Sequence, residues 1–281
     1  MPTTNVPAAI PSLLVAILLG GCGESQPAVT PATGNATNTS PGAVVKAWND
    51  ALTKGDVEAA EEYAAFALAL EKHHAEATMT MAACHMTRHR ANETLSAARA
   101  ALQIDPVGAG TRLWFVAMNF NVGAFEAARE EASRLTRAHP EFSEAFRWRS
   151  MAQLVLGDLA AARADIAMAR SLSPSSMSVE RSVAAVAAQA GDVVTVRSIL
   201  DSFLERSERE WISPLMIAQA HQALGDNNAA FHWYDRAYQV RDNLLTVLHT
   251  DRSWQLSPPG APPITSDPRW ESLIRRIGVA P

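Results

Sequence analysis

Residues 123–157 read GAFEAAREEASRLTRAHPEFSEAFRWRSMAQLVLG, two alanine-rich amphipathic segments held between glycines 34 residues apart. The same interval leads on to Gly191 and Gly225, and Gly55 lies two intervals upstream of the stretch. His89 occupies the one position in this series that lacks glycine. A constant period of this length predicts a helical solenoid, in which each unit buries its apolar face against its neighbours.

The period divides the chain into six units without insertions when each glycine is taken as position 15. The units are residues 41–74, 75–108, 109–142, 143–176, 177–210 and 211–244. Position 32 is proline in three successive units, at Pro106, Pro140 and Pro174. The pattern resembles the 34-residue tetratricopeptide repeat, which implies an all-α, right-handed superhelical solenoid of about six helix hairpins with a C-terminal cap.

Local physical reasons support this division. Glycine at position 15 adopts the left-handed backbone conformation that a turn between two helices requires, because it has no Cβ to clash. An aspartate follows the glycine in four units and is expected to cap the second helix: Asp56, Asp158, Asp192 and Asp226. Small residues at positions 8 and 20 are expected to let the two helices of a hairpin approach closely. Proline at position 32 ends the second helix.

The composition favours a folded chain that does not bind nucleic acid. Of the 281 residues, 48% are hydrophobic and 19% are charged, which is typical of globular rather than disordered proteins. The formal net charge is -5, and no run of Lys or Arg stands out. The electrostatic footprint of a nucleic-acid binder is therefore missing.

The N-terminal part is distinct from the repeats. Residues 1–22 carry no charged side chain and contain an apolar run at 13–19, too short to span a bilayer but suited to a signal-peptide core. The run ends in Leu19-Gly20-Gly21-Cys22, which resembles a bacterial lipobox and implies lipidation of Cys22. Residues 23–40, rich in Thr, Pro, Ala, Asn and Ser, are predicted to form a flexible linker.

The lipobox resemblance implies an exported protein that is lipid-anchored in the cell envelope and faces the periplasm. Gly23 follows the cysteine, in place of the aspartate that the resemblance associates with inner-membrane retention, so the outer membrane is favoured. The stretch before the apolar run has no Lys or Arg and holds three prolines. An uncleaved or non-lipidated leader is therefore the alternative.

Residues 245–281 depart from the repeat and are expected to form capping helices with a proline-rich loop. The apolar run 244–248 predicts one more helix, and prolines are frequent from 258 to 263. Farther on, Asp267 and Pro268 predict the start of a final helix that stops at Gly278.

The sequence contains no common catalytic motif. Phosphate-binding glycine loops, Gly-x-Ser-x-Gly and His-Glu-x-x-His are all absent, so we expect no enzyme activity and no cofactor. Reactive side chains are densest at His73, His74, Cys84, His85 and His89. His85 and His89 lie one helical turn apart, but a metal would need a third ligand. We expect no metal site, because His85 falls at an aromatic packing position and His89 at the turn.

By resemblance to tetratricopeptide arrays, first-helix positions 2, 5, 6, 9, 12 and 13 line the concave face. In units two to four these positions hold an apolar, aromatic patch with two arginines at one edge, which suits a partner peptide. The predicted partner-binding groove consists of Met79, Met86, Leu113, Trp114, Phe120, Arg147, Trp148, Met151, Leu154 and Arg181. The alternative is that these side chains only pack between adjacent helices or fill the superhelix interior.

The carboxylate clamp of chaperone co-factors is not expected. Four of its five positions, known by resemblance, are occupied here by Val45, Thr80, Gly110 and Trp114. We therefore expect a membrane-anchored scaffold that mediates protein–protein interaction in the bacterial envelope and binds a partner segment in its concave groove. The alternative is an envelope protein that binds a small ligand or a metal through the superhelix interior.

Overall fold

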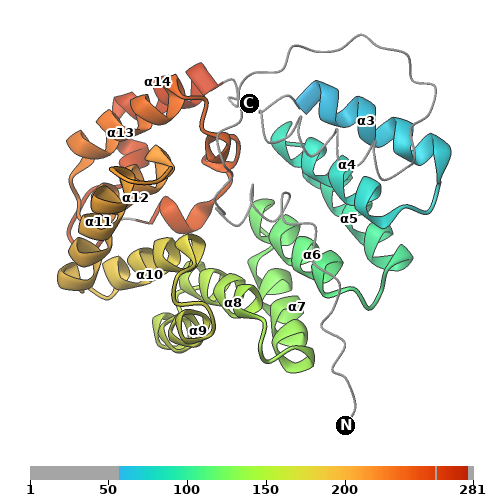
Figure 1. The fold of residues 1–281 in the computed structure, drawn as a ribbon, viewed down its shortest axis with the longest axis horizontal. Coiled ribbons are helices and arrows are strands. Elements are labelled where there is room, and N and C mark those ends of the chain that lie inside the picture. Colours follow the sequence, from blue (N-terminus) through green and yellow to red (C-terminus); the bar gives the residue numbers. More distant parts are fainter. Residues whose placement is uncertain (1–56, 257, 278–281) are drawn as a thin grey trace.

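The computed structural model describes residues 57–256 and 258–277, and every regular element within these ranges is a helix (Figure 1). The predicted signal peptide with Cys22, the linker and the first helix of the first unit lie outside the described residues. Gly55 and Asp56 also lie outside them. No helix of the described part has both the length and the apolar character needed to cross a membrane.

The described part begins with α3 (Val57–Leu70), the second helix of the first unit. Five complete helix pairs follow within the described residues: α4 (Ala75–Thr87) with α5 (Ala91–Ile104), α6 (Ala109–Asn121) with α7 (Phe125–Ala138), α8 (Ser143–Val155) with α9 (Leu159–Leu172), α10 (Met177–Gln189) with α11 (Val193–Ser207), and α12 (Pro214–Ala223) with α13 (Asn227–Gln239). Each first helix also packs on the first helix of the next pair. This nearest-neighbour packing is that of a solenoid.

The turns inside the helix pairs confirm the glycine period. Gly123, Gly157, Gly191 and Gly225 have φ angles of 87°, 85°, 71° and 76°, all in the left-handed region. His89 has a φ of 58° and therefore occupies the same turn position with a side chain that rarely adopts this conformation. The repeat register predicted from the sequence thus holds through the gap in the glycine series.

The predicted caps are present wherever the structure describes them. The carboxylates of Asp158, Asp192 and Asp226 each accept a hydrogen bond of 3.0 Å from the backbone N–H three residues on. These bonds satisfy donors that the first turn of α9, α11 and α13 would otherwise leave free. At the other end, α5, α7 and α9 each stop two residues before the proline at position 32.

Small residues bring the two helices of a pair together. Ala128, Ala162 and Ala230 at position 20 are completely buried. In the fourth unit the contact is polar as well, because the Ser150 hydroxyl at position 8 donates to the carbonyl of Ala162 at 2.8 Å. A hydrogen bond from one helix to the backbone of the other requires the close approach that the sequence predicted.

The chain after α13 contains η1 (Asn243–Val247), η2 (Arg252–Trp254), η3 (Ile264–Ser266) and α14 (Pro268–Ile277). The helix expected at 244–248 is only the short 3-10 helix η1. The last helix begins at Pro268, as predicted, and packs on α13, where Arg276 pairs with Asp235 at 2.7 Å. Figure 1 shows the helices following one another round an arc, with α3 and α14 at its two ends.

Candidate functional site

The interior of the superhelix is occupied by residues 244–256, which we call the return segment. The segment leaves α13 and runs back into the space that the arc encloses (Figure 1). Leu248, Asp251 and Trp254 are only 2%, 7% and 3% exposed. A buried stretch with little regular structure needs side-chain partners for its polar groups, and it finds them on the first helices of several units.

The middle of the return segment meets the second and third units. The ring of His249 lies 4.2 Å, centroid to centroid, from the ring of His89 in the turn after α4. The Thr250 hydroxyl donates to Asn121 Oδ1 at 2.9 Å, a bond between residues 129 positions apart. Asn121 in turn donates through Nδ2 to the carbonyl of Ala117, which fixes the orientation of its amide.

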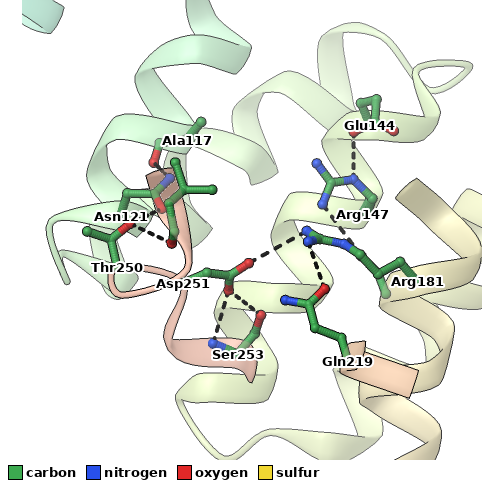
Figure 2. A network of polar contacts seen from close by, with 11 residues as sticks. Ala117, Asn121, Glu144, Arg147, Arg181, Gln219, Thr250, Asp251 and Ser253 are labelled. Atoms are coloured by element: carbon green, nitrogen blue, oxygen red, sulfur yellow. Dashed lines mark hydrogen bonds and ion pairs between the residues drawn. The ribbon is translucent and has the colours of Figure 1, made fainter. Parts of the chain in front are cut away.

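Arg181 on α10 is the main charged contact of the segment (Figure 2). Its Nη2 lies 3.6 Å from Asp251 Oδ2, and its Nη1 donates to Gln219 Oε1 on α12 at 3.1 Å. The guanidinium stands 5.5 Å from the centre of the Trp254 ring. The backbone N–H and hydroxyl of Ser253 donate to the other Asp251 oxygen, so the carboxylate is held in place from within the segment.

The far end of the return segment is tied to the last helix pair. Gln222 on α12 donates through Nε2 to the carbonyl of Trp254. The hydroxyl of Tyr234 on α13 donates to Gln222 Oε1 at 2.6 Å. Burial raises the pKa of Tyr234, which keeps its hydroxyl protonated and available as a donor. The amide of Gln222 therefore links the segment backbone to the repeat array.

Arg147 on α8 lies beside Arg181 in the same network (Figure 2). Its Nε donates to Glu144 Oε2 at 2.6 Å, one helical turn earlier, and its Nη1 reaches the Ser182 hydroxyl at 3.5 Å. The guanidinium stands 4.5 Å from the centre of the Trp148 ring. Arg147 and Arg181 are 1% and 5% exposed, so two cations are buried side by side in the interior.

Burial shapes the electrostatics of this network. It lowers the pKa of Arg181, an effect that Asp251 opposes and Arg147 reinforces. Some buried donors of the network find no acceptor in the described part of the chain: Arg147 Nη2, Arg181 Nε, Trp148 Nε1 and Trp254 Nε1. Because unpaired buried donors cost free energy, the interior offers hydrogen-bonding capacity that the return segment does not use.

The structure divides the ten predicted groove residues into two groups. Arg147 and Arg181 belong to the polar network around the return segment. Seven apolar side chains are buried in the hydrophobic core of the array, and Trp114 packs against the same core while partly exposed; the seven are Met79, Met86, Leu113, Phe120, Trp148, Met151 and Leu154. Phe120 and Trp148, for example, meet edge to face at 5.3 Å. Partner binding at these residues stays a prediction.

Several contact residues of the interior were missed from the sequence. Asn121, Gln219 and Gln222 hold positions 13, 9 and 12 of their units, which belong to the concave set. The repeat register could have identified them as polar side chains at inward-facing positions. Asp251 and Trp254 lie outside the repeat, and no periodic signal in the sequence predicts that they fold back.

The histidine and cysteine side chains of residues 73–89 have separate surroundings. His74 Nδ1 accepts from the backbone N–H three residues on, at 3.2 Å, and caps α4. Cys84 is completely buried, and burial raises the pKa of its thiol to about 12. His89 contacts His249 instead. Across residues 57–256 and 258–277, no three His, Cys, Asp or Glu side chains are placed to hold a metal ion.

The sequence matches no protein-family model and no curated protein. PilF from Pseudomonas aeruginosa is 17% identical over 74% of this chain and 95% of its own, with a TM-score of 0.51. PilW, a type IV pilus biogenesis factor, is 16% identical over 75% of this chain and 100% of its own, with a TM-score of 0.54. The APC/C hetero-tetramer Cut9-Hcn1 aligns at 12% identity over 84% of this chain and 48% of that chain, with a TM-score of 0.53.

These similarities concern the fold. PilF and PilW are tetratricopeptide-repeat proteins, and the present chain shares with them a solenoid of helix pairs. Its left-handed turns recur at the 34-residue interval of that repeat. The chain therefore has the fold of tetratricopeptide-repeat proteins, with its own C-terminal residues in the superhelix interior.

Proposed function

We propose that the protein is a protein-interaction scaffold whose superhelix interior binds an extended segment of a partner. One observation carries this proposal: the interior already holds a buried stretch of polypeptide with little regular structure. Asn121, Arg181 and Gln222 contact that stretch from concave positions of three different units. A surface with side chains placed to bind polypeptide in this way suits a partner segment of similar chemistry.

A preformed array favours such a role physically. The first helices are fixed by packing within and between units, so a ligand would not have to order them on binding. The Cut9-Hcn1 hetero-tetramer, one chain of which shares the fold, is an assembly of different chains. We carry over from this comparison only the general role of holding another chain, and no particular pathway.

In-cell photo-crosslinking tests the scaffold function. A photoreactive amino acid replaces Trp114, a predicted concave residue that is partly exposed and therefore tolerates substitution better than the buried members of the groove. The matched control carries the same amino acid at Val194, which is 80% exposed on the second helix of its unit. We expect a discrete adduct from position 114 and none from 194. Equal adducts at both positions, or none at 114, would contradict groove binding.

We also propose that the scaffold is exported and held in the outer membrane by a lipid on Cys22. The sequence Leu19-Gly20-Gly21-Cys22 supports this, because small residues before a cysteine resemble the lipidation signal of bacterial lipoproteins. Cys22→Ala should abolish incorporation of labelled fatty acid and release the protein from the membrane fraction. The buried thiol at Cys84 supplies the control, since Cys84→Ala should leave labelling unchanged. Membrane retention of the Cys22→Ala protein would favour an uncleaved leader.

A further inference from the structure

We propose that the return segment is an internal competitor for the groove. The two arginines Arg147 and Arg181 form a carboxylate site, and the partner places an acidic residue there, with an aromatic residue three positions later. In the free protein Asp251 and Trp254 hold these places. This inference rests on the proposed function, because it names the chemistry of the segment that the interior binds.

Arg181 is poorly matched to its present acid, Asp251, whereas Arg147 is paired with Glu144 through Nε. Guanidinium groups bind carboxylates best through two parallel hydrogen bonds. Asp251 instead lies 3.6 Å from one nitrogen of Arg181, an ion pair beyond hydrogen-bonding distance. Arg181 Nε and Arg147 Nη2 are buried without an acceptor in the described residues. A partner carboxylate that reaches these donors would bind better than the one now present.

The acid and the aromatic ring of the segment, Asp251 and Trp254, are three residues apart. Asp251 and Trp254 flank the two inner residues of a 3-10 turn, in which side chains three positions apart lie on the same side. Both side chains therefore face Arg181, one as the counter-ion and the other as the ring beneath the guanidinium. Arg252 between them is exposed. The pattern that the site selects is an acid followed three residues later by an aromatic.

Release of the segment need not detach α14 from the array, although it withdraws Leu248 and Trp254 from the hydrophobic core. The segment lies between α13 and α14, and α14 is attached to α13 by its own contacts. Trp270 packs on Tyr234 at 6.3 Å, and Arg276 pairs with Asp235. The segment is thus a loop fixed at both ends. A tethered competitor of this kind reduces the apparent affinity for a partner to the intrinsic affinity multiplied by the fraction of molecules in which the segment is undocked.

The test uses the labelled synthetic peptide TVLHTDRSWQL, the sequence of residues 246–256, and the full-length chain. The Asp251→Asn protein should bind this peptide about 10- to 100-fold more tightly than the wild type, because its internal competitor has lost a charged contact. The same peptide with Asn in place of its acid should bind more weakly by a similar factor. Arg252→Ala is the matched control in the segment and should bind as the wild type does.

Hydrogen exchange identifies where the peptide binds. Saturating peptide should speed exchange of the backbone amides of residues 249–256 in the wild-type protein, because the segment is displaced. Adding Arg181→Met to the Asp251→Asn protein should remove binding. If the Asp251→Asn protein keeps its helical circular dichroism but binds the peptide no better than the wild type, the inference is wrong. Binding that leaves exchange of the segment unchanged would also overturn it.

The two proposals fail in different ways. A peptide that does not bind, together with a persistent adduct at position 114, would refute the acid and aromatic specificity while the scaffold function stands. Absence of the adduct as well would refute both proposals.

Discussion

Asp251→Asn should lower the stability of the folded protein strongly when Arg181 is present, and much less when Arg181 has been replaced. At the 3.6 Å separation of Arg181 Nη2 and Asp251 Oδ2, two unit charges attract by about 5 kcal/mol at an effective dielectric constant of about 20. Desolvation of both groups offsets part of this attraction. Removing Asp251 alone leaves a buried cation with Gln219 as its uncharged partner. We therefore expect Asp251→Asn to lower the free energy of unfolding by about 3 kcal/mol.

The partner substitution isolates the pair. Arg181→Met keeps an unbranched side chain in the same space and removes the buried cation. In the Arg181→Met protein, Asp251→Asn should lower the free energy of unfolding by less than about 1 kcal/mol, since no buried cation is then left unpaired. The coupling free energy of the double-mutant cycle is thus about 2 kcal/mol, measured by urea unfolding of the four proteins. An equal cost of Asp251→Asn in both backgrounds would refute the contact between the segment and α10.

Three further predictions concern the repeat and the segment. Gly157→Ala should lower the free energy of unfolding by about 1–2 kcal/mol in thermal or urea unfolding. A Cβ at this position would contact nothing within 4 Å, so only the backbone φ of 85° opposes the alanine. An unchanged stability would contradict the turn geometry. Asp158→Ala should cost about 1 kcal/mol through loss of the cap on α9, and no loss would show that the cap is not formed. Burial, with a smaller contribution from His89, lowers the pKa of His249 from 6.5 to about 4. Between these two pH values His249 binds a proton in the unfolded chain but not in the folded chain. The free energy of unfolding should therefore rise with pH from about 4 to about 6.5. His249→Gln should flatten this part of the profile, and an unaltered profile would contradict the burial of His249.

The repeat was predictable because its signals are local. A glycine or its substitute at position 15 must take a positive φ, and the following aspartate must cap the next helix, whatever the rest of the chain does. Even His89, which breaks the glycine series, keeps the left-handed turn with a φ of 58°. The register therefore placed the helices and identified which positions face inward.

Occupancy of the interior was not predictable by the same means. The register assigns Arg147 and Arg181 to the concave face, but it does not say what lies against them. The apolar run at 244–248 predicts a helix, whereas the chain forms only the short η1 there. Residues 248–254 then lie in the interior. Two partners of this segment, His89 and Asn121, lie more than a hundred residues away, and sequence periodicity carries no information about such contacts.

The central claim is that the return segment lies inside the superhelix, and a short cysteine crosslink tests it most directly. Asn121→Cys and Thr250→Cys place thiols where two side-chain oxygens now lie 2.9 Å apart. Mild oxidation should join them as a disulfide within one chain, while the control pair of Asn121→Cys with Val194→Cys on the outer surface stays unlinked. A crosslink between 121 and 250 no more frequent than in the control pair would contradict the account.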